Sequence, residues 1–506
     1  MQRITSEADA PLFDIAATRR LEHVAAAALP PHTLMQRAGH AVARLAMALA
    51  PDARTIWVAC GPGNNGGDGF EAAAQLQRHG FHPVVTHLGD AERLPADARA
   101  SFERARAEGV AFADSPPPVY DLAIDALLGI GAVRPPEGAM AEWLARMYAS
   151  PAPLLSVDVP SGLNADTGAW GVAPPFSAAG RRFCLTLLTR KPGLFTAQGR
   201  DAAGEVWFDD LGCAADGETP AARVNERPID RPRTHASHKG SYGDVAVIGG
   251  APGMAGAALL AASAALHAGA GRVYVAPLDE TAAMLDIQHP ELMFRRPAAL
   301  EMAHLSVVCG CGGAGAVHAV LPRVLSTAKA LVLDADALNA IARDASLQAL
   351  LRQRAARGLG TVLTPHPLEA ARLLGIDARQ VQAHRLQAAM SMASRFACTV
   401  ALKGSGTVIA APGEIPRVNI GGNARLATAG TGDVLAGMVG AGLAAGEAAH
   451  AAACAAVWRH GDRADHWPED RPLTAGALAC WGAPRPDAEA ALQALSPARR
   501  RASSSP

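Results

Sequence analysis

Two aspartates stand where their surroundings could support proton transfer. Asp158 begins DVPSGLNADTG (158–168) after an apolar stretch, and Asp433 follows the glycine-containing turn 430–432. A carboxylate held beside a reacting group can give or accept a proton, so both are candidates for general acid–base catalysis. We expect Asp433 to open a long Ala/Gly-rich helix, whose N-terminal N–H groups favour a transferring phosphate. This combination predicts phosphoryl transfer in which Asp433 accepts the proton of an attacking hydroxyl.

A glycine-rich segment in the first half could bind a phosphate-bearing ligand. GPGNNGGDG (61–69) lies between the apolar stretch TIWVAC (55–60) and a helical stretch at 70–78, and it contains the GxGxxG spacing. Glycine allows backbone conformations with positive φ, and the N–H groups at a helix N-terminus can point at a phosphate, so both features favour phosphate binding. Yet the segment carries two asparagines and an aspartate that a bare phosphate turn does not need. The next strand, 82–88, also ends without the usual acidic residue, which argues against a hydride-transferring dehydrogenase.

Oxygen-bearing side chains stand at several predicted strand ends of the first half. They belong to Asn65, Asp125, Asp158 and Ser161. In an open parallel sheet the ligand crevice lies at the carboxyl ends of the strands, so these side chains could converge there. Oxygen ligands suit a hard monovalent or divalent cation better than a transition metal. The sequence therefore predicts a cation site at this edge.

Strand-like stretches alternate with helix-length stretches in both halves, which predicts an α/β fold with mostly parallel sheets. We expect one domain at 10–215 and a second at 225–485, and the polar, proline-bearing segment 216–233 indicates a linker or an excursion at a domain edge. The polar end of the chain, 486–506, is expected to be disordered. The predicted strands are 55–60, 82–88, 121–129, 152–160, 181–189, 205–210, 244–250, 272–277, 305–310, 330–336, 360–365, 399–404 and 407–412, and the clearest predicted helices are 70–78, 255–268 and 379–397.

The composition limits the classes of function. Lys plus Arg is 46 and Asp plus Glu is 47 among 506 residues, a net charge of −1, so no overall field attracts nucleic acid or anionic lipid. No unbroken apolar run is long enough to span a membrane, and the start does not resemble a secretory signal. The eight cysteines lack paired CxxC spacing, which favours neither zinc nor a disulfide scaffold. We therefore expect a cytoplasmic protein with no nucleic-acid or membrane partner.

Three motifs of the first half resemble the YjeF N-terminal domain, the epimerase of hydrated nicotinamide dinucleotides: GPGNNGGDG, DALLGIGAVRP (125–135) and VDVPSGLNADTG (157–168). The resemblance implies a Rossmann-like three-layer αβα sheet that interconverts the R and S forms of NADHX and NADPHX. It implies that Asn65, Asp125 and Ser161 hold a potassium ion and that Asp158 contacts the hydrated ring, where Lys191 could assist or serve the structure alone. The implied dinucleotide site comprises Asn64, Asn65, Gly66, Gly67, Asp68, Gly129, Ile130, Gly131, Ala132, Val133, Arg134, Pro135 and Asp158.

The second half contains, in order, five informative blocks: HKGSYGDVAVIGG (238–250), DADALN (334–339), TPHPLEAARLL (364–374), KGSGT (403–407) and NIGGNARLATAGTGDVLAGMVGAGLAAG (419–446). Together they resemble the YjeF C-terminal domain, the ADP/ATP-dependent NAD(P)HX dehydratase of the ribokinase-like superfamily. That resemblance implies a ribokinase-like αβα domain that phosphorylates the hydroxyl of the S form, with Mg²⁺ as cofactor, and then releases phosphate. No GxxxxGK[ST] occurs, so a P-loop is excluded. Nucleotide contacts are implied for Lys403, Gly404, Ser405, Gly406, Thr407 and Gly432, and hydrate contacts for Ala257, Gly312, His366 and Asp433.

The second domain departs from the family pattern near the expected phosphate turn. Cys311 and Ala314 stand where the family usually has proline and glycine. Ala424 and Arg425 replace a Pro-Gly pair, and Ala429 replaces a glycine. These changes could alter nucleotide affinity or choice, while the expected base is retained.

Together the resemblances predict one bifunctional repair enzyme, in which the epimerase supplies the S form to the dehydratase. NADHX and NADPHX would be its small-molecule substrates, with K⁺ serving the first domain, Mg²⁺ the second, and ADP or ATP as co-substrate. A homo-oligomer is expected because the Ala-rich helical surfaces permit self-association, although they do not specify it. The alternative is a vitamin-precursor kinase, such as a hydroxyethylthiazole or pyridoxal kinase, with a non-catalytic N-terminal binding domain. Retention of Asp125, Asp158 and Ser161 argues against that alternative.

Overall fold

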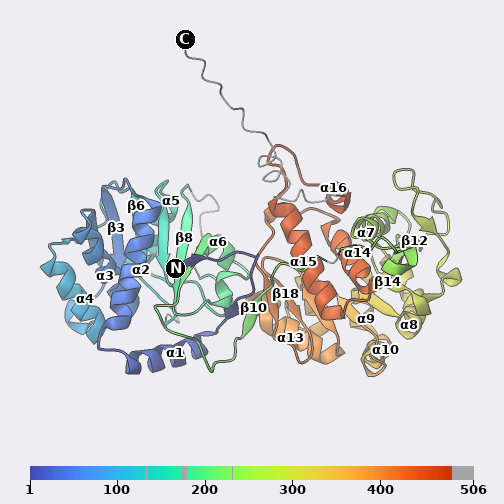
Figure 1. Cartoon of the computed structure of the whole chain (residues 1–506), viewed down its shortest axis with the longest axis horizontal. Coiled ribbons are helices and arrows are strands. Elements are labelled where there is room, and N and C mark those ends of the chain that lie inside the picture. The colour runs from blue at the N-terminus through green and yellow to red at the C-terminus, as the bar shows by residue number, and fades with distance from the viewer. Residues whose placement is uncertain (132–134, 172–178, 231, 481–506) are drawn as a thin grey trace, which may run out of the picture.

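Two α/β halves lie side by side in an elongated molecule (Figure 1). The computed structural model describes residues 1–131, 135–171, 179–230 and 232–480, and the predicted tail lies outside these residues. In Figure 1 the blue-to-teal half contains the first sheet, and the half that ends in red contains the second. No helix among the described residues is long and apolar enough to cross a membrane.

The first sheet has eight strands in the order β1-β9-β8-β7-β6-β3-β4-β5. All neighbours pair in parallel except β1, which runs antiparallel to β9 at one edge. Every carboxyl end of the parallel strands therefore faces the same side. The strands are β1 (Gln2–Arg3), β3 (Thr55–Cys60), β4 (His82–His87), β5 (Ala111–Ala113), β6 (Leu122–Ala126), β7 (Leu154–Val157), β8 (Arg182–Leu187) and β9 (Glu205–Asp209).

Helices cover both faces of this sheet, which is why β3 reads as a continuous apolar run. Ile56 and Val58 pack into one hydrophobic cluster, whereas Trp57 points to the opposite face and meets Trp143 with ring centroids 6.2 Å apart. Side chains that alternate along a strand thus fill two separate cores. The helices of this half are α1 (Ile15–Ala28), α2 (Thr33–Leu49), α3 (Asn64–Arg78), α4 (Ala96–Ala107), α5 (Ala139–Ala149) and α6 (Gly199–Ala203).

The second sheet has eleven strands in the order β13-β12-β11-β14-β15-β16-β17-β18-β19-β10-β2. It is parallel from β13 to β17, and antiparallel pairs join β17 to β18 and β18 to β19. The strands are β2 (Pro11–Leu12), β10 (Ala222–Val224), β11 (Asp244–Gly249), β12 (Arg272–Pro277), β13 (Met293–Phe294), β14 (Ser306–Cys309), β15 (Ala330–Leu333), β16 (Thr361–Leu363), β17 (Thr399–Leu402), β18 (Thr407–Ala410) and β19 (Arg417–Asn419).

Small residues allow the central helices of the second half to pack closely. A Cβ atom added at Gly437 of α14 would lie 2.0 Å from the carbonyl oxygen of Ala261 on α7, and one at Gly440 would lie 2.5 Å from the Val308 side chain on the sheet. The Ala/Gly-rich composition of α14 is therefore a packing requirement. The helices are α7 (Ala255–His267), α8 (Val317–Thr327), α9 (Ala335–Arg343), α10 (Ala345–Ala356), α11 (Pro367–Leu374), α12 (Ala378–Ala383), α13 (Arg385–Phe396), α14 (Thr431–Ala444), α15 (Ala449–Asp465) and α16 (Ala475–Cys480).

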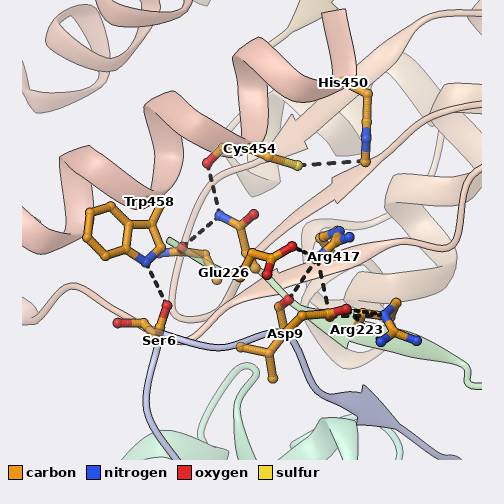
Figure 2. Close-up of polar contacts among 11 residues, drawn as sticks. Ser6, Asp9, Arg223, Glu226, Arg417, His450, Cys454 and Trp458 are labelled. Atoms are coloured by element: carbon orange, nitrogen blue, oxygen red, sulfur yellow. Dashed lines mark hydrogen bonds and ion pairs between the residues drawn. The ribbon is translucent and has the colours of Figure 1, made fainter. Parts of the chain in front are cut away.

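The chain's N-terminal segment joins the two halves (Figure 2). Strand β2 pairs with β10, and β10 pairs with β19, so residues near the start extend the edge of the second sheet. Beside them, Asp9 accepts hydrogen bonds from Arg223 at 2.6 Å and from Arg417 at 3.3 Å. The indole nitrogen of Trp458 donates to the carbonyl oxygen of Ser6 at 2.7 Å. These contacts fix one half against the other.

Two sequence-based expectations of local structure were wrong. The predicted turn 61–69 is largely helical, because α3 begins at Asn64. Its glycines, except Gly63, are needed for close packing instead of a positive φ; a Cβ at Gly66, for example, would lie 2.0 Å from the carbonyl oxygen of Gly61. The predicted helix 379–397 is two helices that meet at His384, whose backbone is not helical. The segment 216–233, expected to be a linker or an edge excursion, contributes the short strand β10.

Candidate functional sites

A cavity of about 600 Å³ opens at the carboxyl edge of the first sheet. It gathers several of the residues predicted from sequence, together with side chains from α1 that the sequence did not single out. Gly66, Gly67 and Pro135 do not line it, and Ala132, Val133 and Arg134 lie outside the described residues. The lining includes Arg19, Glu22, Asn64, Asn65, Asp68, Gly129, Ile130, Gly131, Asp158 and Lys191.

Asp158 and Lys191 form an ion pair at the floor of this cavity. Lys191 is fully buried, and its ammonium group also donates to the carbonyl oxygen of Leu187 at 2.7 Å. The Asp158 carboxylate accepts the Leu187 backbone N–H at 3.2 Å. Asp158 adopts a φ of +66°, a left-handed conformation that is strained for a non-glycine residue. The strained backbone at Asp158 therefore accompanies the position of its side chain in the lining of the cavity.

Two further carboxyl groups share the cavity with that pair. Burial raises the pKa of Asp68 well above its usual value, and the negative charges of Asp158 and Glu22 raise it further. Burial and Asp158 likewise raise the pKa of Glu22. Three acidic side chains thus face one lysine. When like charges crowd a site of low polarity, part of the group keeps its protons near neutral pH. The cavity therefore holds both proton donors and a proton acceptor.

Asp125 and Ser161 do not line this cavity but lie next to it, since Leu128 of the lining donates its backbone N–H to Ser161 Oγ at 2.9 Å. Asp125 is fully buried, and it accepts the Ser161 hydroxyl at 2.6 Å and the Ser161 backbone N–H at 2.9 Å. Burial raises the pKa of Asp125 despite these hydrogen bonds, and no described cationic side chain pairs with it. Asn65 adds a buried side-chain amide, whose oxygen is the atom that can bind a cation. A bound cation would compensate the carboxylate charge, so the donor set fits a hard ion.

The second site lies around the N-terminus of α14. Gly430 precedes the helix with a φ of +88°, and Asp433 lies in the first turn. Burial raises the pKa of Asp433 to about 6, and the charge of Asp334 adds to this effect, whereas a hydrogen bond from the Cys311 thiol opposes it. Asp433 is therefore a carboxylate that ionises close to neutral pH beside a helix N-terminus. A group with this pKa can act as a general base under ordinary conditions.

Lys403 lies between the start of α14 and the neighbouring acidic residues. Its ammonium group lies 2.7 Å from Asp334 Oδ1, and a Cβ at Gly432 would lie 3.1 Å from its Nζ. Burial alone would lower the pKa of Lys403, but Asp334 and Glu369 outweigh burial and raise it. Lys403 is thus a cation held at the start of α14. Burial raises the pKa of Glu369 to about 7, so this residue titrates near neutrality.

His366 is held by a local capping structure. It precedes α11, and its Nδ1 accepts the backbone N–H of Leu368 at 3.1 Å while Glu369 accepts the His366 backbone N–H at 2.8 Å. Burial, followed by the charge of Lys403, lowers the pKa of His366. The imidazole is therefore neutral near pH 7. Elsewhere in this region, Gly312 lies against Ala257, because an added Cβ would be 2.9 Å from the Ala257 Cβ.

A cavity of about 790 Å³ adjoins Lys403 and lies between the two halves of the molecule. Lys403, Gly404, Ser405, Thr407 and Gly432 line it, as the sequence predicted for a nucleotide site. Gly406 does not, since a Cβ there would lie 2.1 Å from the Phe195 carbonyl oxygen. Ala257, Gly312, His366 and Asp433 are also absent from the lining of this cavity.

The first half closes one wall of that cavity, which the sequence did not predict. Arg3, Phe195, Arg200 and Glu205 belong to the lining. Arg200 donates to the Gly422 carbonyl oxygen at 2.5 Å across the boundary, and burial lowers its pKa. Among the described residues, no carboxylate forms an ion pair with it. The charges of Asp465 and Asp201 only partly offset the effect of burial, so this guanidinium is still suited to bind an anion such as a phosphate.

The residues that depart from the family pattern have structural partners. Cys311 is buried and its thiol contacts Asp433. Arg425 turns to the Trp467 carbonyl oxygen, which it contacts at 3.1 Å. Ala314 adopts a φ of +43°, a conformation that favours glycine, and its N–H donates to Asp336 at 2.8 Å. The structure offers no account of how Ala429 affects the site.

Comparisons with known proteins identify both halves. Residues 31–193 match the family described as YjeF-related protein N-terminus, and residues 245–480 match the family described as NAD(P)H-hydrate dehydratase. The Escherichia coli bifunctional NAD(P)H-hydrate repair enzyme Nnr is 36% identical over 450 residues, covering 86% of this chain and 85% of the relative. The ADP-dependent (S)-NAD(P)H-hydrate dehydratase of Neisseria meningitidis is 44% identical over 259 residues, covering 50% of this chain and 86% of the relative. A solved Bacillus subtilis ADP/ATP-dependent NAD(P)H-hydrate dehydratase is 29% identical, with a TM-score of 0.41, covering 49% of this chain and 90% of that chain.

Proposed function

Because the chain belongs to the family of bifunctional NAD(P)H-hydrate repair enzymes, we propose that its two sites carry out two successive reactions on hydrated nicotinamide cofactors. The Rossmann-like first domain interconverts the R and S forms of NADHX and NADPHX. The ribokinase-like second domain converts the S form into NADH or NADPH, and ADP or ATP becomes AMP or ADP plus phosphate. A vitamin-precursor kinase is not favoured, because the relative that spans both halves is a repair enzyme.

The shared cavity of Asp158, Lys191, Asp68 and Glu22 carries the assignment of the first reaction. In the hydrate, the hydroxyl-bearing carbon neighbours the ring nitrogen. If the hydroxyl takes a proton and leaves as water, the nitrogen lone pair stabilises the resulting cation, and water can return to the opposite face. We assign the proton donor to Asp68, because its raised pKa keeps it protonated. Asp158, paired with Lys191, accepts the proton of the returning water.

This assignment accounts for reversibility without any external proton. After one turnover Asp68 has lost a proton and Asp158 has gained one, so the two residues exchange roles for the reverse reaction. The direct test is to incubate purified S-NADHX with the enzyme and no nucleotide, and to separate the epimers by chromatography. Formation of the R form supports the proposed first reaction. An unchanged S form, in a preparation that dehydrates it once ADP is added, would contradict it.

Asn65, Asp125 and Ser161 would hold K⁺ in the first domain. The ion would supply the positive charge that the buried Asp125 carboxylate lacks. Asn65→Ala removes one ligand of the ion. It should damage the ion-free fold little, because the Asn65 Nδ2 makes no hydrogen bond with a described residue. We expect K⁺ to raise the Tm of the wild-type protein relative to Na⁺ or choline, and this difference to shrink in Asn65→Ala. An equal K⁺ effect in both proteins, measured by thermal unfolding, would exclude this site.

For the second reaction, the substrate hydroxyl would attack the terminal phosphorus of the nucleotide while Asp433 accepts its proton. The N-terminus of α14 and Lys403 would stabilise the transferring phosphate. The phosphate ester would then leave as phosphate, with loss of the neighbouring carbon-bound proton, which restores the nicotinamide double bond. Mg²⁺ would be held chiefly by the nucleotide phosphates, because Asp334 is already engaged by Lys403.

Arg200 would complete the nucleotide site from the first domain. Loss of a hydrogen bond to a charged group typically costs about 1.5–3 kcal/mol, so Arg200→Ala should raise the KM for ADP or ATP by about 10–100-fold. The epimerase rate should not change, because Arg200 is not in the lining of the first cavity. Arg78→Ala is the matched control, since Arg78 is paired with Glu108 on the surface of α3. An unchanged KM for both nucleotides in Arg200→Ala would exclude this role.

A further inference from the structure

Two histidines and a cysteine meet on the second domain, away from both cavities. They come from three separate elements: His267 ends α7, Cys480 ends α16, and His289 lies in the loop between β12 and β13. One ring nitrogen of each histidine and the Cys480 Sγ all lie within 4.8 Å of one another. Neither proposed reaction uses these residues. The sequence spacing gave no hint of the cluster, because its members are far apart along the chain.

The distances suit a soft, tetrahedral metal ion. Cys480 Sγ lies 3.5 Å from His289 Nε2. Zinc takes sulfur at about 2.3 Å and nitrogen at about 2.0–2.1 Å, and tetrahedral angles then place the two ligand atoms about 3.5 Å apart. The three ligand atoms lie no more than 4.8 Å from one another, so a small inward movement of these side chains would bring all three to bonding distance of one zinc ion. Thiolate and imidazole ligands select zinc over Mg²⁺, Ca²⁺ or K⁺.

Each imidazole is already oriented by a second hydrogen bond at its other nitrogen. His267 Nδ1 bonds to the Ser263 carbonyl oxygen at 2.9 Å, which leaves its Nε2 for a metal. His289 Nδ1 lies 3.3 Å from Asp286 Oδ2, which likewise leaves Nε2. Histidines that bind a metal characteristically donate their second N–H to a carbonyl or a carboxylate, which fixes the tautomer. Two histidines satisfy this condition independently here.

From this arrangement we infer that His267, His289 and Cys480 form a zinc site of the second domain, with water or the Ser263 hydroxyl as the fourth ligand. Ser263 Oγ is well placed, at 3.3 Å from His289 Nε2 and 3.5 Å from Cys480 Sγ. The three protein ligands supply one thiolate and two neutral imidazoles, so binding releases the thiol proton.

The site would fasten α16 to α7 near the end of the described chain. The first residue of α16, Ala475, lies against Gly430, since an added Cβ at Gly430 would be 2.9 Å from the Ala475 Cβ. Gly430 immediately precedes α14, the helix that binds the transferring phosphate. Helix α7 is about 20 Å long at 1.5 Å per residue. The cluster lies at its C-terminal end, where His267 is the last residue. The expected role of zinc is therefore to stabilise this helix layer, not to take part in the reaction.

The test uses tag-free, full-length protein stripped with a chelator. We expect zinc to bind one per chain in competition with a chromophoric chelator, and Co²⁺ to give a sulfur-to-metal charge-transfer band. Cys480→Ser should abolish the band. Asp286→Asn should lower the zinc affinity by about 10–100-fold, because it weakens the hydrogen bond that orients His289. The decrease in zinc affinity should be larger in Cys480→Ser than in Asp286→Asn. Zinc should raise the Tm of the wild-type protein and not that of His289→Ala.

His450 and Cys454 provide a matched control. They form a similar contact, with Cys454 Sγ 3.7 Å from His450 Nε2 on α15 (Figure 2), but no third ligand joins them in the described chain. The double variant His450→Ala/Cys454→Ser should therefore keep the band and the stoichiometry. Turnover of the S form should be preserved in Cys480→Ser, which verifies folding. Absence of zinc binding, an unchanged band in Cys480→Ser, or loss of the band in the control variant would overturn the inference.

Discussion

Replacing Asp433 with asparagine is expected to reduce dehydratase turnover by about 10²–10⁴-fold, the usual contribution of a general base. Asparagine has nearly the same shape but cannot accept the proton of the substrate hydroxyl. Nucleotide binding should persist, because Lys403, Ser405 and the start of α14 remain in place. The measurement is the initial rate of S-NADHX conversion, together with calorimetric titration of the variant with ADP.

The pH dependence gives the same prediction a second readout. The pKa of Asp433 is raised to about 6, mainly by burial. The residue is therefore protonated and inactive as a base below that pH, so wild-type turnover should fall as the pH falls through about 6. The residual activity of Asp433→Asn should not show this fall. Asp470→Asn is a suitable control, because Asp470 is an exposed residue paired with its neighbour Arg471. Unchanged turnover in Asp433→Asn would contradict the assignment of the base.

The second large effect is expected for Asp158→Asn in the first domain. The R–S interconversion should slow by about 10²–10⁴-fold, since the variant cannot accept the proton of the returning water. Dehydration of the S form by the same chain should continue at the normal rate, which makes the second domain an internal control for folding. Chromatographic separation of the epimers measures the first rate, and recovery of reduced-nicotinamide absorbance measures the second.

Asp158→Asn also leaves Lys191 buried without its partner. Removal of one member of a buried ion pair commonly destabilises a protein by about 3–5 kcal/mol, so the first domain could unfold for a reason unrelated to catalysis. The double variant Asp158→Asn/Lys191→Met removes both charges and so avoids this penalty. A folded double variant without epimerase activity supports the account. Normal epimerisation in either variant would contradict the role of Asp158.

The longer strands of both sheets could be predicted because each is a short apolar run covered by helices. The strands β1, β2, β5, β10, β13 and β19, of two or three residues each, were not predicted. TIWVAC, for example, is β3 from its first to its last residue. The glycine-rich segment after it misled the prediction, since close packing and backbone freedom call for the same residue type. Gly66 is glycine because the Gly61 carbonyl oxygen lies too close for a Cβ, and no sequence pattern separates these two causes.

The parts of the sites that depend on strand ends were also predictable, because parallel strands bring their carboxyl ends to one edge. Asn65, Asp125, Asp158 and Ser161 gather there as expected. Glu22 was missed, because it lies on α1 and reaches the cavity only through the packing of that helix.

Arg200 was missed for a different reason. It reaches the nucleotide cavity through the contact between the two halves, and its hydrogen bond to Gly422 joins residues 222 positions apart. Local patterns carry no information about such a contact. The same limit applies to His267, His289 and Cys480, whose common position depends on how α7, α16 and an intervening loop pack.

The central claim is that one chain repairs both epimers through two separate sites. The most direct measurement is the recovery of reduced-nicotinamide absorbance from a mixture of R and S hydrate, with K⁺, Mg²⁺ and ADP, in the wild-type protein and in Asp158→Asn. We expect full recovery in the wild type, and in the variant rapid recovery of only the S fraction, with the remainder returning at the slow uncatalysed rate. Rapid recovery of only the S fraction in the wild type, or rapid full recovery in the variant, would contradict it.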